Sequence, residues 1–310
     1  MPVKTWSTPV TTEEKRKIPC NLCGSLSFKP SLLCEGFSYI CCTSCGLVQM
    51  NPQPLKEEID RRYSARYGED YLSYELANEK TFLNLQLLAL KDASFDSLEK
   101  EFSSHKGTKA RSRDDYSSLP DLCVSVPPCE PKRILDIGCA VGSLLEELRN
   151  RGWETTGVEI SLPQAEYARQ KRNLDIRSLP LEENKFPPDY FDAILASHLI
   201  EHLNDPAALV NEVRRILVPG GRFFCTTPNI DGFQSRLFRE RWRSAIFDHL
   251  YLFSAKTLSR LLLNKGFTIE KIATWGGLAA GTAPLPVKRI FDKAAKRFGL
   301  GDVMIVKAAK

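Results

Sequence analysis

Apolar positions between residues 132 and 310 follow two alternating periods. Short apolar runs predict seven strands, at 133–137, 155–160, 175–178, 192–196, 222–226, 267–273 and 303–306. Apolar residues spaced three and four apart predict helices between them, at 143–152, 163–172, 206–217, 254–264 and 287–297. Strands that alternate with helices in this way form a parallel sheet with helices on both faces. The pattern therefore predicts a doubly wound α/β domain.

The first strand, turn and helix of this domain carry the features of a nucleotide site. Gly138, Ala140 and Gly142 keep the turn free of large side chains, so a ligand can approach the main chain. The helix that begins at Ser143 supplies free N–H groups for a carboxylate or phosphate. Glu159 follows 17 residues after Gly142, at the end of the next strand, where it can accept hydrogen bonds from both ribose hydroxyls. The segment therefore predicts a nucleotide-type ligand.

The spacing of these small residues narrows the class of ligand. A dinucleotide fingerprint requires glycines at relative positions 1, 3 and 6, which here hold Gly138, Ala140 and Ser143, so hydride transfer is disfavoured. Small residues at positions 1, 3 and 5, preceded by Asp136, instead resemble the S-adenosylmethionine (SAM) loop of class I methyltransferases. The resemblance continues in order along the chain through Phe191-Asp192-Ala-Ile-Leu, Leu217-Val-Pro-Gly-Gly221, Thr227-Pro-Asn229 and Gly266-Phe267.

This resemblance implies a seven-stranded, Rossmann-like methyltransferase sheet that binds SAM. The residues that it implies for the cofactor site are Asp136, Gly138, Ala140, Gly142, Glu159, Leu179, Ser197 and His198. Leu179 belongs to a turn, 178–181, that is placed to cover the adenine. The sequence departs from the family pattern at Ala140, which replaces the middle glycine. A cofactor-binding or adaptor protein without turnover is therefore an alternative.

Two cysteine pairs near the N-terminus have the spacing of a zinc ribbon, with 18 residues between the pairs. The four cysteines are Cys20, Cys23, Cys42 and Cys45. Four thiolates complete a closed tetrahedral site, so the zinc is expected to be structural rather than catalytic. Residues 28–40 can form a hairpin that relies on the metal for its folding energy. Cys41 could replace Cys42 as a ligand, but this would break the two-residue spacing.

A helical connector and an insertion are predicted between the ribbon and the α/β domain. From residue 55 to about residue 92 the pattern is helical, and tyrosines recur at spacings of three and four, at Tyr63, Tyr67, Tyr71 and Tyr74. Their common face either packs on the domain or forms a lid over the substrate. Periodicity fades at 94–131, which predicts a flexible, solvated insertion. The predicted organisation is a zinc-ribbon module at 1–50, a connector with its insertion at 51–130 and a methyltransferase domain at 131–310.

Three of the four histidines lie beside the segments that resemble methyltransferases. His198 and His202 follow the fourth predicted strand and His249 follows the fifth, so all three are expected at the ligand edge of the sheet. Methyl transfer requires that the acceptor be held in line with the sulfonium and lose its proton. A neutral imidazole can accept that proton near neutral pH. These histidines are therefore candidate catalytic residues.

Three family resemblances assign the histidines different roles. Ile200-Glu201-His202 with a later histidine resembles ubiquinone-pathway O-methyltransferases, and also small-RNA 2′-O-methyltransferases, in which a Glu-x-x-Glu-His set and a distant His hold a divalent metal. Here His198 occupies the position of the first Glu. The segment Cys45-Gly-Leu-Val-Gln-Met50, together with Asp248, His249 and Tyr251, is similar to deoxysugar C-methyltransferases, which have an N-terminal zinc module and a His general base.

Three interpretations of this cluster follow from the resemblances. In the first, His249 is the general base, Asp248 orients it and Tyr251 contributes to the acceptor pocket. In the second, Glu201, His202 and His249 bind a catalytic divalent metal. In the third, Glu201 and His202 only hold the loop that covers the methionine part of SAM.

Composition limits the partners and the cellular setting that we expect. A net charge of +5 over 310 residues neither requires nor excludes an anionic partner. The first 19 residues lack the apolar stretch of a secretory signal, and the longest uncharged tract, 272–287, is too short and too rich in Gly and Pro to cross a membrane. We therefore expect a cytoplasmic protein without a membrane partner, whose ten cysteines favour metal binding over disulfides.

The leading functional hypothesis is a SAM-dependent methyltransferase that modifies a hydroxyl oxygen or an acidic carbon of a sugar nucleotide, saccharide or secondary metabolite. An RNA methyltransferase is the alternative, because one segment interleaves basic and aromatic side chains, namely Arg236, Phe238, Arg239, Arg241, Trp242 and Arg243. The acidic residues Asp231, Glu240 and Asp248 in the same segment weaken that alternative. The sequence leaves the oligomeric state open.

Overall fold

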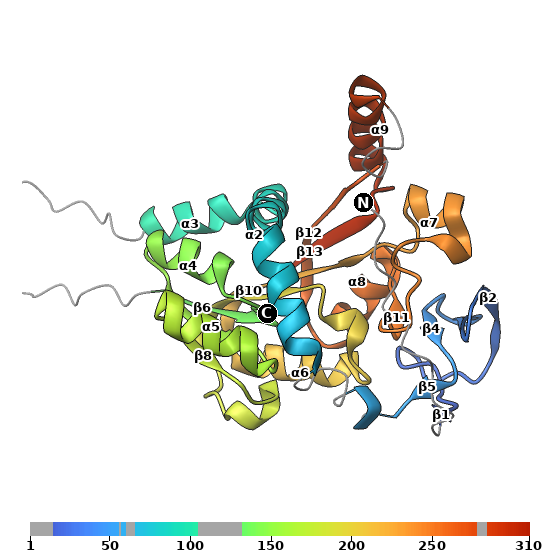
Figure 1. Cartoon of the computed structure of the whole chain (residues 1–310), viewed down its shortest axis with the longest axis horizontal. Coiled ribbons are helices and arrows are strands. Elements are labelled where there is room, and N and C mark those ends of the chain that lie inside the picture. The colour runs from blue at the N-terminus through green and yellow to red at the C-terminus, as the bar shows by residue number, and fades with distance from the viewer. Residues whose placement is uncertain (1–14, 56, 60–65, 105–131, 278–283) are drawn as a thin grey trace, which may run out of the picture.

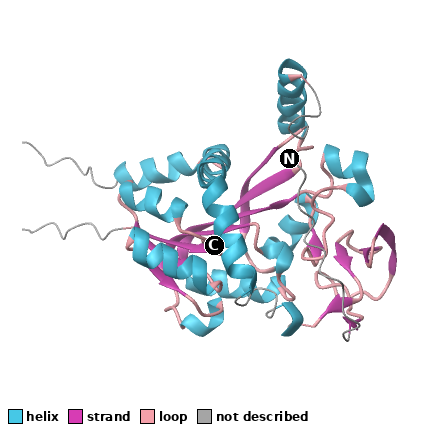
Figure 2. Ribbon diagram, in the orientation of Figure 1, coloured by secondary structure: helices cyan, strands magenta, loops and turns pink. Residues whose placement is uncertain are grey.

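A computed structural model describes residues 15–55, 57–59, 66–104, 132–277 and 284–310 of the chain. These residues form a large unit built on a central sheet and a smaller N-terminal unit built on a second sheet (Figure 1). Helices cover both faces of the central sheet (Figure 2). No helix among the described residues is long and apolar enough to span a membrane.

The central sheet has seven strands in the order β12-β13-β10-β9-β6-β7-β8. The strands are β6 (Arg133–Ile137), β7 (Glu154–Val158), β8 (Asp175–Arg177), β9 (Phe191–Ser197), β10 (Leu217–Pro228), β12 (Thr268–Trp275) and β13 (Val303–Ala309). Neighbouring strands are parallel except at β13, which runs antiparallel to both β10 and β12. The predicted seven-stranded, doubly wound α/β fold is confirmed, and each observed strand overlaps a predicted one.

Five helices match those predicted from the spacing of three and four. They are α4 (Ser143–Asn150), α5 (Leu162–Arg172), α6 (Pro206–Ile216), α8 (Ala255–Asn264) and α9 (Leu285–Phe298). Local chemistry explains two of the helix starts. The Asp205 carboxylate accepts hydrogen bonds from the amides of Ala207 and Ala208 in α6, and Ser254 and Thr257 form a capping box at α8. The shorter elements are η2 (Leu181–Asn184), η3 (Ile200–His202), α7 (Phe233–Phe238) and η4 (Arg239–Arg241).

The N-terminal unit is a four-stranded antiparallel sheet in the order β11-β4-β3-β2. Strands β2 (Phe28–Cys34), β3 (Phe37–Cys42) and β4 (Val48–Met50) lie in the predicted ribbon, whereas β11 (Tyr251–Leu252) comes from the methyltransferase-like part of the chain. A separate pair joins β1 (Lys15–Arg16) to β5 (Gln53–Pro54). One buried apolar cluster contains both Leu47 of the ribbon and Leu250 beside β11. The ribbon and the larger unit therefore share a core, while the predicted domain limits stay a prediction.

Two helices join the ribbon to the large unit. They are α2 (Arg66–Asp92), which was predicted, and α3 (Phe95–Ser104), which falls where the sequence predicted a flexible insertion. That prediction is wrong for 95–104, because Phe95 and Leu98 are buried and the Phe95 ring lies 5.5 Å from the Trp153 ring. Residues 105–131 lie outside the described part of the chain. Of the predicted tyrosine face, only Tyr71 and Tyr74 have described side chains, and both are about half exposed rather than packed in the core.

Candidate functional site

The loop that follows β6 has the backbone shape of a tight turn. Gly138 and Gly142 both have φ of 76°, and a Cβ at Gly142 would lie 2.6 Å from the Leu174 side chain, so only glycine fits there. Ala140 has φ of 48°, a left-handed conformation that a residue with a Cβ adopts at a cost. The loop therefore keeps the shape of the predicted cofactor turn despite the alanine in its middle.

Glu159 closes this loop from the end of β7. Its Oε2 accepts a hydrogen bond from the Ala140 amide at 3.0 Å, and its Oε1 accepts one from the Ser161 amide at 2.8 Å. Burial raises the pKa of Glu159, and the backbone donors oppose that rise. The carboxylate is thus held beside the loop with further lone pairs for a ligand. Its predicted contact with the ribose stays a prediction.

Asp136, at the penultimate position of β6, is a buried acid with an unmet acceptor. It is 1% exposed, and its Oδ1 has no hydrogen-bond partner among the described residues. Burial, reinforced by the charge of Glu159, raises the pKa of Asp136 to about 8. Native proteins rarely leave a buried acceptor unpaired, so this atom indicates a position where a bound molecule or water donates. The loop residues therefore fit a ligand that carries hydrogen-bond donors and positive charge.

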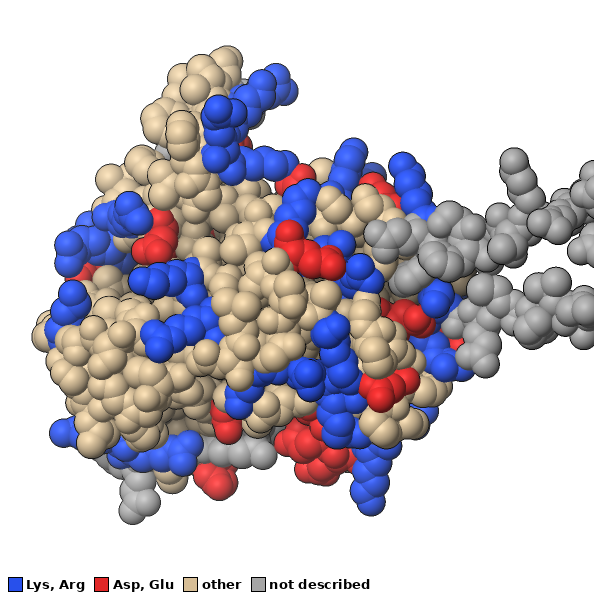
Figure 3. Space-filling model, turned by 180° about the vertical axis from the view of Figure 1, so that it is seen from behind, with Lys and Arg blue, Asp and Glu red and all other residues tan. Residues whose placement is uncertain are grey.

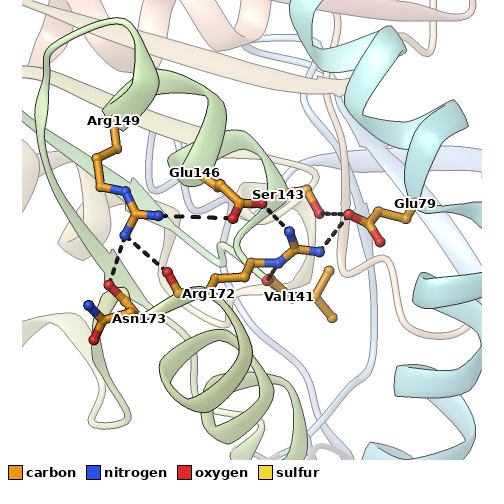
Figure 4. A network of polar contacts seen from close by, with 7 residues as sticks. All are labelled: Glu79, Val141, Ser143, Glu146, Arg149, Arg172 and Asn173. Carbon is orange, nitrogen blue, oxygen red and sulfur yellow. Dashed lines mark hydrogen bonds and ion pairs between the residues drawn. The ribbon is translucent and has the colours of Figure 1, made fainter.

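Helix α2 is fastened across the start of α4 by a network that the sequence analysis missed (Figure 4). The Glu79 carboxylate accepts hydrogen bonds from the Ser143 hydroxyl at 2.9 Å and from the Arg172 guanidinium at 2.5 Å. Arg172 also donates to the Val141 carbonyl at 2.8 Å and pairs with Glu146. The network joins α2, α4, α5 and the loop, so α2 is held against the end of the loop where α4 begins (Figure 4).

A second carboxylate of α2 lies one helical turn before Glu79. Burial raises the pKa of Glu75 to about 7, its hydrogen bond to Tyr71 opposes the rise, and the charges of Glu159 and Glu79 add to it. Carboxylates that raise one another's pKa lie in a region of negative electrostatic potential. The space between α2 and the loop therefore favours a cation.

The remaining predicted cofactor residues lie at the same edge of the sheet. Ser197 ends β9, which pairs with β6, so it lies near the end of the strand that leads into the loop. His198 follows with φ of 52° and a half-exposed side chain. Leu179 lies before η2 and is half exposed. Their contacts with a cofactor stay predictions.

Glu201, His202 and His249, which we call the histidine site, lie together beyond the ends of β9 and β10. Their metal-binding atoms all lie within 4.8 Å of one another, and the two imidazole rings are 4.7 Å apart. Glu201 is fully buried, accepts a hydrogen bond from the Thr227 hydroxyl at 2.9 Å and lies 3.3 Å from Nδ1 of His198. Burial alone would raise the pKa of Glu201, but the histidines outweigh it and lower the pKa to about 2.

Backbone carbonyls orient both rings of the histidine site. Nδ1 of His202 lies 2.9 Å from the carbonyl of Asp248, and Nδ1 of His249 lies 2.8 Å from the carbonyl of Ser244. A carbonyl can only accept, so each Nδ1 carries the hydrogen and each Nε2 is left with the lone pair. This is the arrangement in which histidines bind metals, with the second nitrogen held by an outer partner. The site therefore has the donor set of a divalent metal site.

Burial changes what His249 can do. It lowers the pKa of His249 to about 3, with His202 contributing in the same direction. A base whose conjugate acid has so low a pKa is weak near neutral pH, whereas a neutral imidazole is the form that binds metals.

Tyr251 is fully buried and donates to the Asn204 carbonyl at 3.0 Å. The place of Tyr251 in an acceptor pocket stays a prediction.

The residues that orient the two imidazole rings differ from the sequence prediction, in which Asp248 orients His249. The carbonyl of Asp248 holds His202, and the ring of His249 is held by Ser244, which the sequence analysis did not single out. No sequence signal could have identified Ser244, because its main-chain carbonyl makes the contact and every residue has one.

The four ribbon cysteines converge as predicted. Cys20 and Cys45 have sulfurs 3.4 Å apart, and those of Cys23 and Cys42 are 3.6 Å apart. A tetrahedral site with Zn–S bonds of ~2.3 Å places its sulfurs about 3.8 Å apart, whereas a disulfide would need about 2.05 Å. The cluster contains Cys42 rather than Cys41, in agreement with the two-residue spacing. These residues therefore fit one zinc ion with no open position.

Two side chains of the segment that suggested RNA binding have structural contacts. Trp242 is buried and its indole donates to Asp302, so it cannot stack on a base. Arg243 pairs with the same carboxylate at 2.6 Å. On the face shown in Figure 3, Lys and Arg are interspersed with Asp, Glu and uncharged areas rather than joined in one basic stripe. These contacts remove one of the two aromatic side chains on which the RNA hypothesis relied, whereas Phe238 stays exposed.

Comparison with known proteins places the chain among methyltransferases. Residues 113–272, more than half of the chain, match the family described as methyltransferase domain. The ubiquinone biosynthesis O-methyltransferase of Aeromonas salmonicida (strain A449) is 35% identical over 104 residues, which are 32% of this chain and 44% of that relative. The enzyme of the same name from Idiomarina loihiensis is 33% identical over 104 residues, 32% of this chain and 43% of that relative. The matched part thus spans less than half the length of these relatives.

Solved structures share the fold at low sequence identity. A chain in the complex between the Haloferax volcanii Trm112 methyltransferase activator and a methyltransferase has a TM-score of 0.50 and 14% identity, with 83% of this chain and 99% of that chain covered. A SAM-dependent methyltransferase from Archaeoglobus fulgidus has a TM-score of 0.45 and 20% identity, with 58% of this chain and 86% of that chain covered.

Proposed function

The chain belongs to the methyltransferase-domain family, and on this premise we propose that it moves a methyl group from SAM to a hydroxyl oxygen of a small molecule. The observation that carries the proposal is one edge of the sheet, where the loop after β6 and the histidine site follow the neighbouring strands β6 and β9. In an open α/β sheet, ligands bind beyond the carboxyl ends of such strands. A cofactor and an acceptor bound there would lie side by side.

The charge of the loop region supports SAM as the cofactor. SAM carries a positive sulfonium, and its methionine part carries an ammonium group. Burial raises the pKa values of Asp136, Glu159 and Glu75, and the charge of Glu159 adds to the rise at Asp136 and Glu75. A cation among these carboxylates is therefore stabilised. Glu159 has lone pairs left to accept from a ribose, and the N-terminus of α4 offers free amides. Transfer of the methyl group leaves a neutral sulfur, which this field retains less strongly.

The histidine site supports a bound divalent metal, with Glu201, His202 and His249 as its ligands. Thr227 and the carbonyls of Ser244 and Asp248 hold those ligands in place. His198 replaces a glutamate of the resembling families, which enriches the site in imidazole. Imidazole favours zinc, iron, nickel or copper, whereas magnesium and manganese prefer oxygen ligands. When bound, such an ion lowers the pKa of a hydroxyl that it contacts.

This metal role is better supported than a general-base role for His249. The low pKa of His249 makes it a weak proton acceptor, and one of its ring nitrogens lies within 4.8 Å of ligand atoms of Glu201 and His202. An oxygen acceptor also agrees with the relatives, which are described as O-methyltransferases. We retain a saccharide or secondary metabolite as the acceptor class, and the cysteine site as a structural zinc site.

The test compares metal-stripped and metal-loaded full-length protein. A mild chelator is applied, metal analysis verifies that the ribbon zinc remains, and transfer from labelled SAM is measured on small-molecule and RNA fractions of a cell extract. We expect labelling of small molecules that is lost on chelation and returns with zinc, iron or nickel. His249→Ala and Glu201→Gln should each abolish the metal-dependent labelling. Wild-type turnover by His249→Ala on the acceptor so found would contradict both the metal and the general-base roles.

A further inference from the structure

We propose that the cysteine ribbon (residues 20–50) positions the histidine site, and that Tyr39 is the positioning residue that connects the two. The inference rests on the proposed function, because it assigns a role to the ribbon of that same enzyme. Tyr39 lies in β3, is 1% exposed, and its hydroxyl is 2.7 Å from the Ile246 carbonyl and 2.8 Å from the His249 carbonyl. One hydroxyl hydrogen is thus shared between two carbonyls of the segment that carries His249.

Residues 244–252, which we call the 244–252 segment, make three main-chain contacts with the histidine site. The carbonyl of Ser244 holds the His249 ring, and the carbonyl of Asp248 holds the His202 ring. The Leu250 amide donates to the Glu201 carbonyl at 2.7 Å. The positions of all three members of the site therefore depend on the path of one main-chain segment.

This segment has little regular structure of its own. Between η4 and β11, residues 242–250 form turns and irregular backbone, with neither helix nor strand. Backbone of this kind is held in place by its neighbours rather than by a ladder of its own hydrogen bonds. A displacement of about 1 Å is enough to weaken a catalytic or metal site. The histidine site therefore needs an outside element to hold the 244–252 segment.

The ribbon supplies that element through strand pairing and packing as well as through Tyr39. β4 pairs with β11, where Val48 lies opposite Leu252, and the Met50 amide donates to the Leu250 carbonyl at 2.8 Å. The Phe37 ring lies 5.7 Å from the rings of both Tyr39 and Phe247, edge to face in each case. A ribbon of this size relies on its metal for folding. Zinc at the cysteines is therefore coupled, through β3 and β4, to the geometry of the histidines.

Tyr39→Phe isolates the hydroxyl, because it retains the ring and its packing. Two buried or partly buried carbonyls lose their donor, and we expect the divalent-metal affinity of the histidine site to fall about tenfold. Turnover should fall with it, while KM for SAM and the affinity for the demethylated product stay unchanged, since the loop after β6 is untouched. The ribbon should keep its zinc. Tyr190→Phe is the matched control. Tyr190 precedes the first residue of β9, whereas Glu201 and His202 of the histidine site follow the last residue of that strand.

Hydrogen exchange gives a readout that is independent of activity. Peptides from the 244–252 segment should exchange faster in Tyr39→Phe than in the wild type, and Tyr190→Phe should leave them unchanged. Equal exchange and equal metal affinity in Tyr39→Phe and the wild type would overturn the inference. If the wild type binds no ion at the histidines and transfers no methyl group, the proposed function fails. Exchange in the 244–252 segment then still decides whether Tyr39 holds it.

Discussion

Replacing Ala140 by glycine should stabilise the protein. Ala140 has φ of 48°, in the left-handed region, which costs an L-residue about 1–2 kcal/mol. Glycine removes this cost but adds conformational freedom to the unfolded chain, which costs about 0.4–1 kcal/mol. The net gain is therefore about 0–1.6 kcal/mol, with a midpoint near 0.8 kcal/mol. The hydrogen bond from the residue 140 amide to Glu159 is made by the backbone, so the substitution retains it.

The same substitution in a helix should have the opposite sign, which provides the control. Ala77 is exposed and lies in the middle of α2, where its backbone is helical. Ala77→Gly should therefore cost about 0.5–1 kcal/mol. Urea denaturation, followed by tryptophan fluorescence, measures the free energy of unfolding of both variants. In a thermal melt, the melting temperature of Ala140→Gly should be about 1–4 °C higher than that of the wild type. Equal losses of stability in both variants would refute the argument from backbone strain.

Ala140→Gly also tests the alternative of an adaptor without turnover. If the alanine methyl group obstructs the cofactor, the variant should bind the demethylated product more tightly than the wild type in a calorimetric titration. If the loop shape alone matters, the affinity should stay within a factor of about two, because the left-handed turn is already formed. Methyl transfer by the wild-type protein would by itself exclude the adaptor hypothesis.

Three further predictions concern the ribbon and the loop carboxylates. Cys23→Ser should remove about one zinc per chain in metal analysis and lower turnover, while the loop after β6 still binds the demethylated product. Full zinc occupancy in this variant would contradict the assignment of the four cysteines as zinc ligands. Glu159→Gln should weaken SAM binding by about 1.5–3 kcal/mol, which calorimetry measures directly, and an unchanged Kd would remove Glu159 from the site. Asp136→Asn should stabilise the ligand-free protein at pH 7. The raised pKa of Asp136, about 8 against an ordinary 3.8, means that the folded state holds a proton that the unfolded state releases, so wild-type stability falls as pH rises from about 4 to 8. The gain in melting temperature should vanish near pH 4, and a gain that is independent of pH would exclude this cause.

The sequence by itself determined the parts of the structure that depend on nearby residues. Periods of two and of three to four predicted all seven strands of the central sheet and five of the helices after residue 143, because burial of one face imposes that spacing. Cys20 and Cys23, like Cys42 and Cys45, converge because a two-residue spacing with a following glycine bends the chain locally. The shape of the loop after β6 follows from its small residues in the same way.

Only the tertiary structure decided which atoms meet across long separations. Helix α3 was missed because its apolar face is short, and Phe95 packs against Trp153 and Phe224, which lie far along the chain. The Glu79 and Arg172 contact joins two helices whose order in space the local pattern does not specify.

The histidine site shows the same division. Its residue types and their place after β9 and β10 could be predicted, because parallel strands end at one edge of the sheet. Which nitrogen of each ring carries the hydrogen depends on the carbonyls of Ser244 and Asp248. The segment that carries those carbonyls is contacted by Tyr39, more than 200 residues earlier, at the carbonyls of Ile246 and His249. A carbonyl is present in every residue and leaves no mark in the sequence, so its role emerges only when folding brings it to a particular side chain.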